Sequence, residues 1–214
     1  MASRNRTRFL LSLVILILTS QSCAPAAEPS PTIDPNPVDP GILNDLASFG
    51  GTLNPETAFQ TLHENIRDNP SELARAAIQQ LENADPAVRF AAIYALANTA
   101  ETQQHLDGLR SLLSSQSAGE RLLAAEALLV RGEKEAIPVL IAALNSEEEL
   151  AYSLPPQQAW QAASSLLLLY TLEDFGLAGA DTFELVAVTQ PAWQAWWEQQ
   201  GGNLQWMADL GVYQ

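Results

Sequence analysis

Residues 85–96 read Asp85-Pro86-Ala87-Val88-Arg89-Phe90-Ala91-Ala92-Ile93-Tyr94-Ala95-Leu96, and the same pattern occurs a second time in the chain. It returns at an offset of 32 as Ser117-Ala118-Gly119-Glu120-Arg121-Leu122-Leu123-Ala124-Ala125-Glu126-Ala127-Leu128. The two copies share an arginine and the same pattern of alanines and leucine. A helical unit that repeats at about this period is typical of an α-solenoid, in which helix pairs stack side by side.

Further copies lie on the C-terminal side of this stretch. Ala136–Leu144 echoes His105–Leu113 at an offset of 31, and both have the pattern of the first helix of a pair. Ala159–Tyr170 echoes the second helix at an offset of 38, with the extra length in the loop 147–156. No stretch shows the sustained alternation of a strand. The sequence therefore predicts an all-α fold, a short α-solenoid of antiparallel helix pairs over residues 71–175.

Helix-start residues support these boundaries. Asp85 stands where a cap belongs, and Pro86 at the first helical position. Asn54-Pro55-Glu56 has the same form and begins an amphipathic segment. We expect residues 42–70 to form an N-terminal helical cap on the stack.

The repeat resembles the HEAT-repeat family, and most closely its short, bacterial, lyase-like variety. Asp85-Pro86-Ala87-Val88-Arg89 and the following Ala91–Leu96 match the family's second helix nearly residue for residue. The resemblance implies a binding scaffold, and it implies that Asp85, Arg89 and Arg121 are structural residues of the repeat, with each arginine bonded to the loop of the next repeat. The alternative is that Arg89 and Arg121 bind a ligand on the concave face.

The N-terminus has the form of an export sequence. Arg4, Arg6 and Arg8 precede the apolar run 9–18, which is shorter than the roughly 20 apolar residues that span a bilayer. Residues 1–22 are therefore interpreted as a signal peptide, and Thr19–Cys23 resembles the lipobox of bacterial lipoproteins. The resemblance implies that Cys23 becomes the lipidated N-terminus. Ordinary cleavage after Ala26 and an uncleaved anchor are the alternatives.

Residues 23–41 follow as a tether. Six prolines, at positions 25, 29, 31, 35, 37 and 40, favour an extended polyproline-like spacer. At about 3.1 Å per residue this segment reaches on the order of 55 Å. We expect a protein anchored in the membrane through lipid on Cys23, on the periplasmic or extracellular face.

Composition limits the partners. Ten basic and 25 acidic residues give a net charge of −15, and loss of the three N-terminal arginines would leave 7 − 25 = −18. A surface this acidic repels phosphate backbones, so nucleic acid is not expected as a partner. Cys23 is the single cysteine, so no internal disulfide can form.

The loop 147–156 is the predicted contact site for a partner. Glu147, Glu148 and Glu149 supply charge, and Tyr152 supplies apolar surface beside it. The three acids are also candidate Ca²⁺ ligands. However, consecutive acids do not all face one ion without a tight turn, so a solvated charge run is preferred and no metal site is predicted.

Residues 176–214 are predicted to cap the C-terminal end of the stack. Trp193, Trp196 and Trp197 share one helix face at the i, i+3, i+4 spacing, and Trp206 follows. Together with Phe175-Gly176, they resemble the Trp-rich helix that closes the last repeat of bacterial HEAT proteins. A solenoid must cover its apolar end, which favours the cap. The alternative is an aromatic platform for sugars or for a membrane interface.

No constellation of catalytic residues stands out. His63 and His105 are the two histidines, and His63-Glu64-Asn65 lacks the second histidine of a zinc-protease helix. No Gly-rich phosphate loop or Gly-x-Ser-x-Gly motif is present. We therefore expect no cofactor and no enzymatic activity, although an enzyme with paired carboxylates is a third hypothesis.

The leading hypothesis is a membrane-anchored, monomeric scaffold that binds an unidentified protein partner in the cell envelope. The alternative is a carbohydrate or cell-wall binding module that uses the C-terminal tryptophans.

Overall fold

Prolines start the helices of the N-terminal half. A computed structural model describes residues 38–48, 55–150 and 157–214. In it, α1 (Pro40–Ala47), α2 (Pro55–Asp68), α3 (Pro70–Gln80) and α4 (Pro86–Thr99) each begin at a proline. Proline suits the first helical position because the backbone N–H that it lacks would have no helical partner there. Cys23, the predicted signal peptide and Tyr152 lie outside the described residues.

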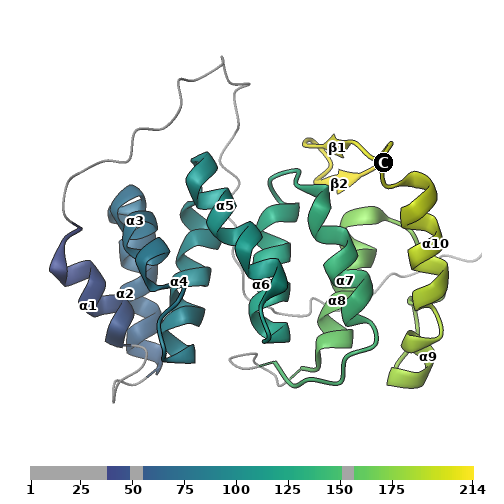
Figure 1. Cartoon of the computed structure of the whole chain (residues 1–214), viewed down its shortest axis with the longest axis horizontal. Coiled ribbons are helices and arrows are strands. Elements are labelled where there is room, and N and C mark those ends of the chain that lie inside the picture. Colours follow the sequence, from purple (N-terminus) through teal and green to yellow (C-terminus); the bar gives the residue numbers. More distant parts are fainter. Residues whose placement is uncertain (1–37, 49–54, 151–156) are drawn as a thin grey trace, which may run out of the picture.

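The remaining elements continue the row. They are α5 (Gln103–Ser111) with the short 3-10 helix η2 (Leu112–Ser114), α6 (Ala118–Leu129), the 3-10 helix η3 (Lys134–Ala136), α7 (Ile137–Ala143), α8 (Ala159–Thr171), α9 (Phe183–Ala187) and α10 (Gln190–Gln200). The pairs α3/α4, α5/α6 and α7/α8 follow one another along the long axis, with α1 at one end and α10 at the other (Figure 1). The predicted all-α solenoid is confirmed. Its first helix begins at Pro40, slightly before the predicted boundary at residue 42.

Alanines allow the second helices to approach closely. In α4, Ala91, Ala92 and Ala95 are fully buried, as are Ala124 and Ala125 in α6. Leucines such as Leu96 and Leu128 fill the space between the layers, where they are also buried. The repeated order of small and large residues in the sequence therefore produces repeated helix contacts in the stack.

The C-terminal segment packs against the last repeat. Trp193 of α10 has no exposed surface, and its ring meets Phe175 edge-on at 4.9 Å between centroids. Gln190 Nε2 donates to the Ile141 carbonyl at the end of α7 (3.2 Å). These contacts hold α10 against α7 and cover the apolar end of the stack.

A small hairpin, which the sequence analysis did not predict, completes the cap. Strand β1 (Trp206–Met207) pairs with β2 (Val212–Tyr213) in antiparallel register. The Tyr213 hydroxyl donates to the Leu129 carbonyl (3.2 Å), and Lys134 Nζ donates to the carbonyls of Gly202 and Leu204. The hairpin is thereby fixed to the end of α6 and to η3.

Gly132 lets the hairpin approach. It follows α6 with φ at +82°, a region that favours glycine, and the site where a Cβ would stand lies 3.2 Å from the Trp206 ring. None of the helices formed by the described residues is long and apolar enough to cross a bilayer.

Gly132→Ala should destabilise the fold more than Gly179→Ala. Both glycines have positive φ, so alanine costs about 1 kcal/mol at each. Of the two, Gly132 also has an aromatic ring in the way, whereas no atom of the described residues lies within 4 Å of the site for a Cβ at Gly179. Urea unfolding of both variants measures the difference. Equal losses would show that the Trp206 contact does not constrain Gly132.

Candidate functional site

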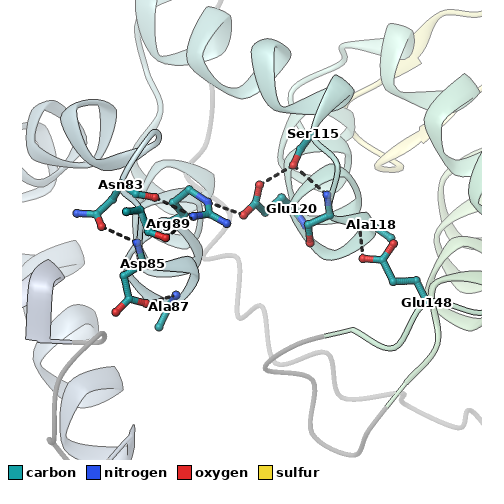
Figure 2. Close-up of polar contacts among 10 residues, drawn as sticks. Asn83, Asp85, Ala87, Arg89, Ser115, Ala118, Glu120 and Glu148 are labelled. Atoms are coloured by element: carbon teal, nitrogen blue, oxygen red, sulfur yellow. Dashed lines mark hydrogen bonds and ion pairs between the residues drawn. The ribbon is translucent and has the colours of Figure 1, made fainter.

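Asp85 organises the start of α4. Its Oδ1 accepts from the Ala87 backbone N–H (2.8 Å), and its own N–H donates to Asn83 Oδ1 (2.9 Å; Figure 2). The side chain therefore satisfies a first-turn donor that has no helical partner. The predicted cap is present.

Arg89 joins the loop before its own helix to the next repeat. Its Nη1 donates to the carbonyls of Asn83 (2.8 Å) and Ala84 (3.1 Å), and its Nε donates to Glu120 Oε1 at 2.8 Å (Figure 2). The family resemblance implied a bond to the loop of the next repeat, and this is wrong in detail. The loop is the arginine's own, and the next repeat contributes a carboxylate from α6.

Glu120 receives a second donor. The Ser115 hydroxyl donates to Glu120 Oε2 at 2.6 Å, so each carboxylate oxygen has a partner. The side chains of Arg89 and Glu120 are only 24% and 12% exposed. Burial from water strengthens this ion pair relative to one on the surface.

Arg121 repeats half of this arrangement. Its Nη1 donates to the carbonyls of Ser115 (2.6 Å) and Gln116 (2.9 Å), as Arg89 does to its own loop. Among the residues that the structure describes, no carboxylate forms an ion pair with Arg121. The two arginines that the sequence makes equivalent thus differ in their acidic partner.

The three glutamates of the acidic loop have different roles, although all of them are exposed. Glu148 Oε1 accepts from the Ala118 N–H (2.8 Å), which adds a second cap to α6 beside Ser117 (Figure 2). The backbone of Glu149 bridges to Gln158. Tyr152, the fourth predicted contact residue, lies outside the described residues. Glu148 is therefore bonded to the stack, whereas no described residue bonds to the side chains of Glu147 and Glu149, which face solvent.

Arg131 was missed by the sequence analysis. Its Nη2 donates to the Ala97 carbonyl (2.7 Å), its Nε to Ala100 (3.1 Å) and its Nη1 to Ala127 (2.6 Å). Burial lowers the pKa of this guanidinium, and the charge of Glu101 opposes that effect. A basic residue just after a helix end was the available clue, because such residues often bond terminal carbonyls.

The four C-terminal tryptophans differ in exposure. Trp193 is fully buried, whereas Trp196, Trp197 and Trp206 are half-buried. Trp193 and Trp196 meet edge-on at 5.5 Å, and the Trp206 ring lies 5.0 Å from that of Tyr213. The cluster therefore packs chiefly against the protein itself.

Both histidines have structural contacts. His63 Nε2 lies 2.9 Å from the Tyr94 hydroxyl, and His105 Nδ1 accepts from the N–H of Glu101 just before α5. Burial lowers the pKa of His105. Within residues 38–48, 55–150 and 157–214, no three His, Cys, Asp or Glu side chains come close enough to hold a metal ion.

Glu126 is a buried acid in the C-terminal half of α6. It is 8% exposed, and its Oε2 has no hydrogen-bond partner among the residues that the structure describes. Burial raises the pKa of Glu126 to about 7, because the ionised carboxylate loses its hydration there. Burial, together with the charge of Glu126, also raises the pKa of Tyr170.

The comparison with protein families agrees with the geometry. Residues 74–152 match the family of HEAT repeats. This stretch runs from within α3 to just past the predicted contact residues Glu147, Glu148 and Glu149. The resemblance seen in Asp85 and Arg89 is confirmed. A search of the curated proteins found no match to the chain.

The Arg89–Glu120 pair should show a coupling energy of about 1 to 2 kcal/mol, as expected for a half-buried, charge-assisted hydrogen bond. A double-mutant cycle with Arg89→Gln and Glu120→Gln in urea unfolding measures it. The cycle cancels the bonds that Arg89 makes to its own loop. The matched control is the exposed pair Arg67–Asp68, 2.8 Å apart, for which no measurable coupling is expected. Equal coupling in the two pairs would contradict a special role for Glu120.

Glu126 should make the protein less stable as pH rises. Its pKa is about 7 in the folded state, against an ordinary value of 4.5, so folding favours the protonated form. The stabilisation is complete below pH 4.5 and is lost between pH 4.5 and about 7, by up to about 3 kcal/mol. Glu126→Gln should therefore gain stability relative to the wild type across this range.

Unfolding free energies at pH values from 4 to 8 test the pH effect. The exposed Glu82→Gln serves as the control and should run parallel to the wild type. A Glu126→Gln curve that also stays parallel would refute the raised pKa.

Proposed function

We propose that this HEAT-repeat protein is a non-catalytic scaffold that binds a protein partner in the cell envelope. HEAT repeats generally serve as scaffolds for protein interaction, and residues 74–152 carry them here. The main support for this proposal is the hydrogen bonding between repeats. Hydrogen bonds connect each repeat to the next through four side chains: Arg89, Glu120, Glu148 and Arg131. This bonding supports a rigid surface of stacked helices.

The charge of the chain favours a partner with basic surface. The net charge is −15, and Glu147 and Glu149 present exposed carboxylates beside the stack. Opposite charge on a partner would speed the encounter and favour the correct orientation. The loop that holds these residues remains our proposed contact region.

Anchoring through Cys23 is the second element of the proposal. The basic opening, the short apolar run and the single cysteine support export and lipidation. The proline-rich segment that follows would hold the stack away from the bilayer. A lipid at the N-terminus and helix pairs at the end of a spacer together suit a scaffold that collects a partner at a membrane surface.

The carbohydrate-binding alternative receives less support. A sugar platform requires an accessible aromatic face, and Trp193 has none. Trp196 and Trp206 direct part of their surface to Phe175 and Tyr213, respectively. Their packing is explained by closure of the stack.

Cys23→Ser should move the protein from the membrane fraction to the soluble fraction of the producing cells, because it removes the only thiol that can carry lipid. Ultracentrifugation followed by immunoblotting measures this. The matched control is Ser22→Ala, which keeps the cysteine and should leave the protein in the membrane. Retention of Cys23→Ser in the membrane fraction would disprove lipid anchoring.

The same cells test the scaffold. A photo-crosslinking amino acid at Glu147, in the wild-type background, should capture one discrete protein, identified by mass spectrometry. A crosslinker at Gln79, exposed on α3 far from the acidic loop in the sequence, is the comparison. Absence of a specific adduct at Glu147 would count against this loop as the contact region.

A further inference from the structure

The carboxylate of Glu120 occupies a slot built by two earlier residues. Arg89 Nε donates to one oxygen at 2.8 Å, and the Ser115 hydroxyl donates to the other at 2.6 Å. Ser115 Oγ is itself held by the Ser117 N–H (3.2 Å). An arginine from one repeat and a serine from the following loop thus bind an acidic side chain that projects from the first turn of α6.

The next repeat contains both donors again. Arg121 corresponds to Arg89 at an offset of 32, and Ser146 corresponds to Ser115 at an offset of 31. Ser146 Oγ accepts from the Glu148 N–H (3.4 Å), as Ser115 Oγ accepts from Ser117. The backbone bonds of Arg121 likewise copy those of Arg89.

The carboxylate of the second slot is missing from the sequence. At the sequence offset of 38, the position that matches Glu120 is Gln158, which is the N-cap residue of α8, whereas Glu120 lies in the first turn of α6. Its Oε1 accepts from Trp160 Nε1 at 2.6 Å, so this side chain is used elsewhere. Within the part of the chain that the structure describes, the guanidinium of Arg121 is left without the acidic partner that its counterpart has.

Both donors belong to the wall of one hollow. Arg121 and Ser146 both line an open hollow of about 240 Å³. The rest of its wall is apolar and comes from η2 and α7: Leu113, Pro138, Val139, Ala142 and Ala143. The site therefore combines one cation and one hydroxyl with a surface that suits an aliphatic side chain.

We propose that this hollow binds a glutamate or aspartate side chain of the protein partner, with a neighbouring aliphatic side chain against Pro138 and Val139. The carboxylate would replace the missing counterpart of Glu120 and accept from Arg121 and Ser146. Because the chain carries a net charge of −15, the rest of the partner segment is neutral or basic. The inference rests on the proposed scaffold function and names the chemistry of its partner.

A pair of blocked peptides tests the slot directly. The probes are acetyl-Lys-Ala-Leu-Glu-Leu-Ala-Lys-amide and its twin with glutamine in place of glutamate. They are titrated into the full-length ¹⁵N-labelled protein, and the Nε–Hε signal of Arg121 is followed. The glutamate peptide should bind at least about ten times more tightly than the glutamine twin, as expected for a charge-assisted hydrogen bond.

Three variants locate the effect. Arg121→Gln should abolish the preference for glutamate, whereas Arg67→Gln removes the same charge at an exposed site and should leave the preference unchanged. Because Arg121 also holds its own loop, Gln158→Glu provides the second test. It supplies the carboxylate from within the chain and should abolish the preference while the fold is kept.

Equal binding of the two peptides to the wild type, or an unchanged preference in Gln158→Glu, would overturn the proposal. The scaffold function is judged separately by the crosslinked partner. If the wild type and Gln158→Glu capture the partner equally and no peptide preference is seen, the slot is refuted and the scaffold function is supported. If the peptide preference is seen but no partner is captured, the slot is supported and the scaffold function is refuted.

Discussion

The stack depends on carboxylates that accept hydrogen bonds from neighbouring repeats. Glu120 accepts hydrogen bonds from Arg89 and from Ser115, and Glu148 accepts one from the Ala118 N–H. A largely buried carboxylate such as that of Glu120 is costly to leave alone, because its lost hydration must be replaced by good hydrogen bonds. Once paired, it fixes the register between repeats, since a shift of one helix would separate the carboxylate of Glu120 from the guanidinium of Arg89.

Helix α6 is where these constraints meet. Its N-terminus is capped by Ser117 and by Glu148 from the next repeat. Beyond its C-terminal end, Arg131 reaches back to the carbonyls of Ala97 and Ala100. Gly132 then admits Trp206, which brings the C-terminal hairpin into the same structure. The central helix thus connects the N-terminal repeats with the cap, and a partner would meet one rigid surface.

The sequence predicted what depends on neighbours in the chain. Asp85 and Pro86 could be recognised as a cap because acceptor and donor are two residues apart. The partners that Arg89 and Arg131 have in other repeats could not be identified, because they are 31 to 34 residues away and their positions depend on loop lengths. The hairpin was not predicted, because its strands are two residues long and show no alternation of polar and apolar residues. The difference in acidic partner between Arg89 and Arg121 became clear only from the position of Gln158 in the structure.

The protein thus has two related slots: one is filled by Glu120 from within the chain, and the other, at Arg121, is open. The most direct measurement is the hydrogen exchange of the arginine Nε–H groups in a ¹H–¹⁵N spectrum of the full-length protein. The Nε–H of Arg89, held by Glu120, should exchange slowly, and that of Arg121 should exchange at the rate of a solvent-exposed guanidinium. Equal, slow exchange of Arg89 and Arg121 would show that the second slot already has a partner and is not open.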